Sequence, residues 1–255
     1  MEDNYISQHH FINNAPDHYI WIPIRDNEID HYMMLITLCR EAMLTGTKKE
    51  KGDTLETLMT FVYERFNNVA EVTPNTNHGD NQIDHILEFY DGLAPIFIHN
   101  YIGMRIIGES KNHNKSIGVR EVADLNELLR YKRANLGIFS SFKTFSRGHN
   151  GSPWQYAEGK RRKLSLSRNT FIIGFTLDEL ESLTKNNFYT LLKHKFFNLI
   201  DEIDDDYTEE NFRLTYHEKL YHSLLQLFKN EIINEEQFIL AREEIIKKYG
   251  FLEKV

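Results

Sequence analysis

The chain has 255 residues, of which 41% are hydrophobic and 13% aromatic, so it is expected to fold around a substantial core. No apolar run approaches the ~20 residues needed to cross a bilayer. The first four residues (MEDN) are acidic and polar, which argues against a secretory or transit signal. The single cysteine, Cys39, excludes an internal disulfide and a cysteine-based zinc site, so a reducing cytoplasm is the expected compartment.

The net charge of −8 is distributed unevenly along the chain. Residues 130 to 168 carry ten basic side chains and one acid, whereas residues 178 to 255 carry 17 acids and 10 bases. Local clusters of charge, rather than the total, attract phosphate, so this basic segment is the predicted nucleic-acid-binding strip. Alternatively, the basic run at residues 160 to 163 is simply a helix face exposed to solvent. The candidate phosphate contacts are Lys143, Arg147, Lys160, Arg161, Arg162 and Lys163.

In the first half of the chain, apolar spacing predicts two helices and a strand. After an irregular start, residues 28 to 44 form the first predicted helix. Residues 45 to 52 are a polar break and the expected boundary in this half. The second helix is predicted over residues 54 to 66. A polar loop at 75 to 81 then leads into a strand at 83 to 89.

The second half alternates short apolar runs with helical periodicity. Thr176-x-x-Glu179 has capping-box spacing, which predicts that a helix begins there. Together these elements predict an α/β fold, a mixed β-sheet flanked by helices with a helical C-terminal extension. The predicted elements are a strand or hairpin at 96 to 107, a strand at 106 to 111, a helix at 121 to 133, a strand at 136 to 141, a helix from Pro153 capped by Ser152, a strand at 170 to 175, a helix to about 183, and helices after 186 interrupted by an acidic turn at 201 to 210.

Three ionisable residues occur where two of the predicted strands come together. Glu109 and Lys111 are separated by one residue on a strand, so their side chains should project from the same face. If the strand containing Asp84 pairs with this one, two carboxylates and an ammonium group converge. Carboxylate oxygens suit a hard divalent cation, and a neighbouring lysine can orient a water and offset charge in a phosphodiester transition state.

This arrangement resembles the PD-(D/E)XK nuclease superfamily, and within it the modification-dependent, Mrr-like restriction endonucleases. The similarity covers roughly residues 50 to 184, from the helix at Gly52-Asp53-Thr54-Leu55-Glu56 through Asp84 and Glu109-x-Lys111-Asn112 to the strand at 136 to 141. Asp84 follows Ile83, where the family name has proline.

The resemblance implies a restriction-endonuclease-like core and a magnesium ion, for which manganese substitutes. It assigns metal binding to Asp84, Glu109 and the main-chain carbonyl of Ser110, with Glu56 in support. It assigns to Lys111 the positioning or activation of the attacking water. For Glu56 a structural role remains open, because Asp53-x-x-Glu56 also has capping-box spacing. Trp154 and Tyr156 adjoin the basic strip and could stack on bases, although packing against a helix is the commoner fate of such side chains.

Three regions are therefore expected, at residues 1 to 46 (an extension with a helix), 47 to 184 (the nuclease core) and 185 to 255 (an acidic helical region). The expected activity is metal-dependent DNA cleavage in prokaryotic defence against phage or other foreign DNA. A protein partner such as a helicase, or a second copy of the chain, would bind the acidic C-terminal region. Two alternatives stay open, a nuclease acting on RNA or branched DNA and a non-catalytic binding module.

Overall fold

The computed structural model describes residues 15–78, 81–148, 153–201, 216–229 and 232–249. Three short turns, η1 (Glu64–Phe66), η2 (Ile98–Ile102) and η4 (Ser182–Thr184), connect the main elements. The strands are β1 (Ala70–His78), β2 (Asn81–Phe89), β3 (Arg105–Lys111), β4 (Leu136–Ser141) and β5 (Phe171–Thr176). The helices are α2 (Asp17–Ile20), α3 (Asp26–Thr45), α4 (Lys48–Tyr63), α5 (Val119–Lys132), α6 (Tyr156–Arg168), α7 (Leu177–Glu181), α8 (Phe188–Ile200), α10 (Tyr216–Lys229) and α11 (Glu235–Tyr249).

The five strands form one mixed sheet in the order β1-β2-β3-β4-β5. Neighbouring strands β1, β2 and β3 run antiparallel, whereas β3, β4 and β5 run parallel to one another. The two parallel connections pass through α5 and α6, as parallel pairing requires a crossover. The predicted α/β class and mixed sheet are thereby confirmed.

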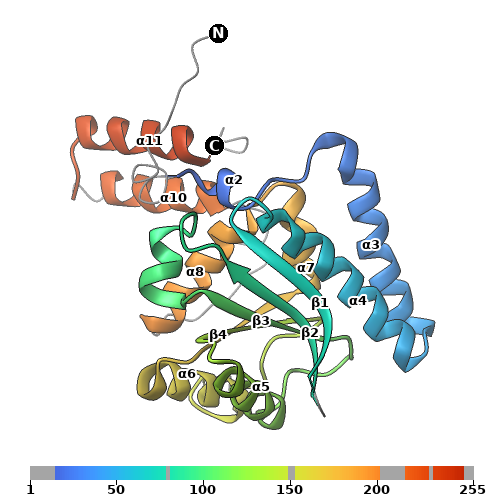
Figure 1. Ribbon diagram of the computed structural model, residues 1–255. Coiled ribbons are helices and arrows are strands. Elements are labelled where there is room, and N and C mark those ends of the chain that lie inside the picture. Colours follow the sequence, from blue (N-terminus) through green and yellow to red (C-terminus); the bar gives the residue numbers. More distant parts are fainter. Residues whose placement is uncertain (1–14, 79–80, 149–152, 202–215, 230–231, 250–255) are drawn as a thin grey trace.

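Helices cover both faces of this sheet (Figure 1). One face packs against α4, α7 and α8 through buried side chains such as Leu55, Leu180 and Phe188. The other face packs against α5 and α6, where Val122 and Leu164 are buried. Because both faces are covered, the interior strand β4 is buried at every position, which explains the apolar run of its first four residues, LGIF.

The polar break expected at residues 45 to 52 is mostly helical. Only a short turn separates α3 from α4, which begins at Lys48. Thr47 caps α4: its hydroxyl accepts from the Glu50 N–H at 3.3 Å, and the Glu50 carboxylate accepts from the Thr47 N–H at 2.7 Å. The predicted break between two helices is present but spans only Gly46 and Thr47, since a Thr-x-x-Glu capping box inside the polar run begins α4.

The first hairpin was also missed in part. The predicted loop at 75 to 81 belongs largely to β1 and β2, whose register pairs Ala70 with Phe89 and His78 with Asn81. The segment predicted as a strand or hairpin at 96 to 107 forms the π-helical turn η2 before β3. The helix expected from Pro153 begins at Tyr156, and both its proposed cap Ser152 and most of the predicted acidic turn lie outside the described residues.

A single large core cluster crosses both expected region boundaries. It joins Trp21 and Tyr32 of the N-terminal extension to Phe188 and Phe196 of α8, around side chains of the central sheet. Neither the boundary at 46/47 nor the one at 184/185 separates one core from another. The described residues between 15 and 201 form one packed unit on both faces of the sheet.

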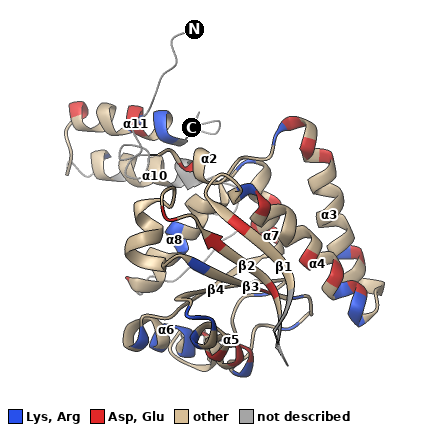
Figure 2. Ribbon diagram, viewed as in Figure 1, with Lys and Arg blue, Asp and Glu red and all other residues tan. Residues whose placement is uncertain are grey.

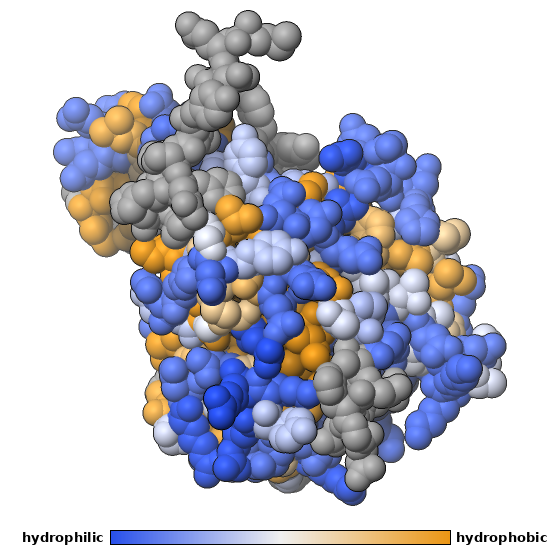
Figure 3. Space-filling model, in the orientation of Figure 1, coloured by the Kyte–Doolittle hydropathy of each residue, from blue (hydrophilic) through white to orange (hydrophobic). Residues whose placement is uncertain are grey.

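The C-terminal helices α10 and α11 form a hairpin beside α2 (Figure 1). The rings of Phe228 and Phe238 stack between the two helices with centroids 4.9 Å apart. Hydrophobic side chains are exposed over this hairpin, at the upper left of Figure 3. Those with large exposed fractions are Leu227, Ile232, Ile239 and Leu240.

Candidate active site

The register of β2 and β3 brings the predicted carboxylates together. His85 pairs with Gly108 in this antiparallel ladder, so the next position along places Asp84 level with Glu109. The Ser110 N–H donates a hydrogen bond of 2.6 Å to Asp84 Oδ2. This bond fixes the carboxylate of one strand against the backbone of the next, at the residue that separates Glu109 from Lys111.

Glu109 and Lys111 lie on the same face of β3, as the alternation of a strand predicts. Lys111 Nζ lies 2.6 Å from Glu109 Oε1, with side chains 32% and 17% exposed respectively. The predicted convergence of Asp84, Glu109 and Lys111 is therefore present in the structure. This partial burial is enough to strengthen electrostatic interactions while leaving a path for solvent.

The site carries more negative charge than its lysine balances. Burial, followed by the neighbouring Asp84 carboxylate, raises the pKa of Glu109 to about 7. Burial also raises the pKa of Asp84, although the Ser110 N–H and Lys111 oppose this. Burial by itself would lower the pKa of Lys111, but the surrounding carboxylates, Glu109 first, outweigh it and raise that pKa. A bound cation would relieve this repulsion.

Glu56 contributes to the same field from α4. Burial, then the Asp84 and Asp53 carboxylates, raise the pKa of Glu56, and the Glu56 charge in turn helps to raise that of Glu109. The structural alternative for Glu56, a capping box with Asp53, is wrong because α4 begins at Lys48 and is capped by Thr47. Glu56 lies well inside the helix, and its charge interacts with those of Asp84, Glu109 and Lys111.

The donor set suits magnesium better than a fully protein-caged metal. Among the described residues, no group of three or more histidine, cysteine, aspartate or glutamate side chains is placed to hold an ion. Magnesium, however, is commonly bound through one or two carboxylates and keeps several waters. Asp84 and Glu109 supply two hard oxygen donors, and their pKa values are raised chiefly by burial. These residues therefore fit a magnesium ion.

Buried side chains support the two strands beneath the carboxylates. His85 is fully buried next to Asp84, and its Nε2 lies 2.8 Å from Thr60 Oγ1 on α4. Its ring meets Tyr63 edge-on with centroids 5.1 Å apart. Burial lowers the pKa of His85 to about 4, so this histidine is neutral near pH 7 and serves packing. A side chain at Gly108 would place its Cβ 2.8 Å from the Tyr63 ring.

The first turn of α5 adds an acid that was predicted only as part of a helix. Glu121 Oε1 lies 2.8 Å from His113 Nε2, and the other oxygen accepts from the Gly118 N–H at 2.5 Å. The Glu121 charge also raises the pKa of Lys111. The sequence could have indicated Glu121 as a site residue, because it lies in the first helical turn after the acid-x-lysine strand and acids favour helix N-termini.

The predicted basic strip is only partly exposed. Lys143 and Lys163 are exposed, and Lys160 and Arg147 are half-buried. Arg161 and Arg162 are instead 5% and 1% exposed, and both bind the buried carboxylate of Glu158 at distances of 2.7 to 2.8 Å. The prediction that these two arginines contact phosphate was wrong, because the interior of α6 uses them as partners for Glu158. The blue of α6 in Figure 2 marks its arginines, the two buried ones included, as well as its lysines.

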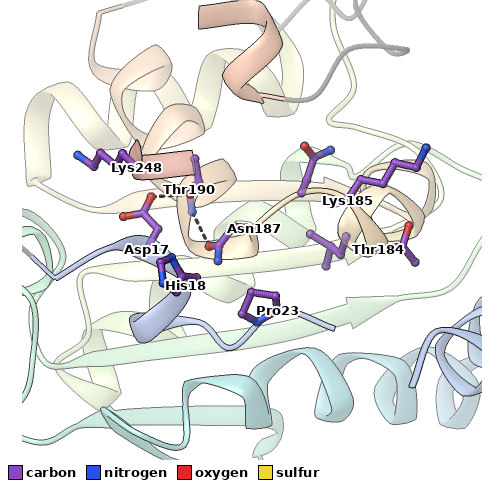
Figure 4. Close-up of a pocket in the computed structure, with 10 residues that line it drawn as sticks. Asp17, His18, Pro23, Thr184, Lys185, Asn187, Thr190 and Lys248 are labelled. Atoms are coloured by element: carbon purple, nitrogen blue, oxygen red, sulfur yellow. Dashed lines mark hydrogen bonds between the residues drawn. The ribbon is translucent and has the colours of Figure 1, made fainter. Parts of the chain in front are cut away.

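A separate pocket of about 140 Å³ lies between α2 and the turn that precedes α8 (Figure 4). Its buried carboxylate, Asp17, accepts from Thr190 Oγ1 at 2.5 Å and pairs with Lys193 at 2.6 Å. Asn187 caps α8 by accepting from the Thr190 N–H at 3.1 Å. These contacts hold the N-terminal segment against α8. The polar residues that line the pocket therefore have a structural role.

The fold and this cluster define an α/β protein whose central sheet presents two carboxylates and a lysine at one point. No protein-family model matches the chain, and comparisons with curated proteins and with solved structures find no match. Among the described residues, no helix is both long and apolar enough to span a bilayer. The geometry of the cluster is thus the basis for proposing a function.

Proposed function

We propose that this protein is a magnesium-dependent endonuclease of the PD-(D/E)XK type that hydrolyses phosphodiester bonds in DNA. The observation that carries the proposal is the hydrogen bond from the Ser110 N–H to Asp84, which brings Asp84 beside the Glu109 and Lys111 pair. The order of elements supports it, because one helix, three antiparallel strands, a helix and a parallel strand follow one another from α4 to β4.

In this proposal each side chain has a distinct role. Asp84 and Glu109 hold the cation, with Glu56 contributing through its field or through a bound water. The metal would supply Lewis acidity and a water of lowered pKa. Lys111 orients that water and offsets the charge that develops on the phosphate. Lys143, Arg147, Lys160 and Lys163 attract the nucleic-acid backbone without reading its sequence.

The test is cleavage of supercoiled plasmid by purified protein in magnesium or manganese, compared with Glu109→Gln and Lys111→Ala. Both variants should lose at least about 100-fold in rate, because each removes a charged group that acts in the transition state. Glu88→Gln is the matched control, since Glu88 pairs with Arg105 on the same two strands but at their other end. Equal cutting by Glu109→Gln and wild type would show that the activity arises elsewhere.

A non-catalytic binding module is the second candidate. The observation that favours it is the lack, among the described residues, of a group of three or more metal-binding side chains. Thermal unfolding separates the two candidates independently of cleavage. A nuclease site should be stabilised by millimolar magnesium or manganese through Asp84 and Glu109, whereas a module that binds no metal should show no shift.

The biological setting we propose is prokaryotic genome defence, with a protein partner such as a helicase, or a second copy of the chain, on the C-terminal helices. The exposed apolar side chains of α10 and α11, Leu227 and Leu240 among them, support a docking surface there. Recovery of this chain alone and as a monomer from native cells would count against both kinds of partner.

A further inference from the structure

We infer that Trp154 and Tyr156 form a stacking platform for unpaired bases, so that the preferred substrate contains single-stranded DNA. This inference rests on the proposed nuclease function and specifies its substrate class. Trp154 is 40% exposed and Tyr156 is 54% exposed. The expected fate of these side chains, burial against a helix, is therefore not what the structure shows.

The backbone holds Tyr156 in a conformation that a bulky residue seldom adopts. Its φ angle is +52°, in the left-handed region. Arg133 and Asn169, which share that region, are helix C-caps, where such angles are common. Tyr156 is instead the first residue of α6. Left-handed conformations of bulky residues cost free energy and concentrate at functional sites.

The strand pairing and two hydrogen bonds place this platform at the same end of the sheet as the candidate active site, where β3 and β4 finish. Strands β3 and β4 are parallel and Lys111 pairs with Ser141, so the loops that follow both strands leave the same edge. The Ser146 N–H donates to the Ile117 carbonyl at 2.9 Å, which joins the two loops. The Glu158 N–H donates to the Ser146 carbonyl at 3.1 Å, which joins them to the first turn of α6.

The surroundings suit a polyanion. Lys163 is exposed and Lys160 is half-buried on α6, whereas Arg162, 5.9 Å from the centre of the Trp154 ring, is buried against Glu158 and only supports that ring. Lys143 is exposed in the loop between β4 and α6. A basic groove with exposed aromatic rings is the arrangement by which proteins bind single strands, since each base presents a π-face for stacking. A paired base in a duplex has its faces covered by its neighbours.

The first test is binding of a fluorescein-labelled oligothymidine strand and of a duplex of equal length, in EDTA, followed by anisotropy. Trp154→Leu and Tyr156→Leu keep apolar bulk but remove the ring, and each should weaken strand binding roughly 5- to 100-fold. Duplex binding should change less than about twofold, since phosphate contacts remain. Trp154→Phe and Tyr156→Phe should restore strand binding and thereby exclude a folding defect.

Tyr131→Leu is the matched control, because Tyr131 is 69% exposed but lies in the last turn of α5, at the other end of that helix. It should bind both ligands as the wild type does. Unchanged strand binding by Trp154→Leu and Tyr156→Leu would overturn the inference. Equal weakening on strand and duplex would also overturn it, because the contact would then be a general one.

Tryptophan emission gives a second readout on the same protein. The chain has two tryptophans, and Trp21 is fully buried while Trp154 is exposed. Addition of oligothymidine should quench the wild type but leave Trp154→Phe, which retains only Trp21, unchanged. Quenching that persists in Trp154→Phe would contradict stacking on Trp154. Because these measurements need no cleavage, failure of the platform and failure of the nuclease proposal are distinguishable.

Discussion

The negative charge of the Glu109 carboxylate destabilises the folded state. Its pKa is raised to about 7 by burial and by Asp84, from a usual value of 4.5. A raised carboxyl pKa means that the folded state resists ionisation more than the unfolded state does. The resulting destabilisation is absent below about pH 4.5, grows as the pH rises toward 7, and is fully present above it.

We therefore predict that Glu109→Gln stabilises the metal-free protein. A glutamine can still accept from Lys111 but adds no negative charge beside Asp84. The expected gain at pH 8 is ~1–3 kcal/mol, or roughly 2–10 °C in Tm for a domain of this size. Thermal unfolding in EDTA at pH 8 and at pH 4.5 measures it, and the gain should vanish at the lower pH.

Glu127→Gln is a suitable control for this prediction, because Glu127 forms an exposed pair with Arg130 and should change Tm little. A loss of stability in Glu109→Gln at pH 8 would mean that the Glu109 and Lys111 ion pair outweighs the repulsion. Such a result would remove the electrostatic reason for a cation at this site.

Single residues differ in how well the sequence predicted them. Glu109 and Lys111 were predictable because the period of a strand alone fixes a shared face. Asp84 required a pairing that the sequence suggested but did not determine. Arg161 and Arg162 were misassigned because Glu158 was counted only in the charge balance, although it lies three and four residues earlier and therefore on the same helical face.

At the scale of elements, two glycines near the site give opposite predictions. Gly52 lies inside α4, where an added Cβ would meet only Glu56 Oε1 at 3.7 Å, an ordinary contact. Gly52→Ala should stabilise by ~0.5–1 kcal/mol, since glycine is a poor helix former. Gly108→Ala on β3 should destabilise by ~1–3 kcal/mol, because the Tyr63 ring would have to move.

Chemical denaturation of the two variants and the wild type measures both effects. The midpoint should rise for Gly52→Ala and fall for Gly108→Ala, with the slope of the transition unchanged. If Gly108→Ala were as stable as the wild type, the close packing of α4 on β3 would be incorrect. The support proposed for Asp84 and Glu109 would then lose its basis.

Elements buried on both faces were predicted most accurately. The strand at 136 to 141 was placed correctly because every residue of β4 is buried and its first four residues, LGIF, form an apolar run. The edge strand β1 was missed because it contains Pro74 and few apolar residues, although Ala70 and Val72 alternate with Glu71 and Thr73. Edge strands carry weaker patterns because one side of their backbone has no partner strand.

At the scale of the molecule, the hydrophobic core extends beyond the region predicted to be the nuclease core, residues 47 to 184. The predicted nuclease region ends at residue 184, yet α8, which lies outside it, covers one face of the sheet together with α4 and α7. Thirteen buried residues of the large cluster lie outside residues 47 to 184, within the described part of the chain. They are Ile20, Trp21, Ile24, Tyr32, Leu35, Ile36, Cys39, Phe188, Tyr189, Leu191, Leu192, Phe196 and Leu199.

We therefore predict that a fragment of residues 47 to 184 does not fold cooperatively, whereas residues 1 to 201 do. Burial of one large apolar side chain contributes ~1.5–3 kcal/mol, so losing this set exceeds the ~5–15 kcal/mol by which domains are stable. Removing α10 and α11 costs much less, since their apolar contacts, such as Phe228 with Phe238, are largely to each other. Circular dichroism during heating distinguishes the fragments. A sharp transition in residues 47 to 184 would show that the sheet and its nearest helices form a self-sufficient core, with the flanking helices as additions to it.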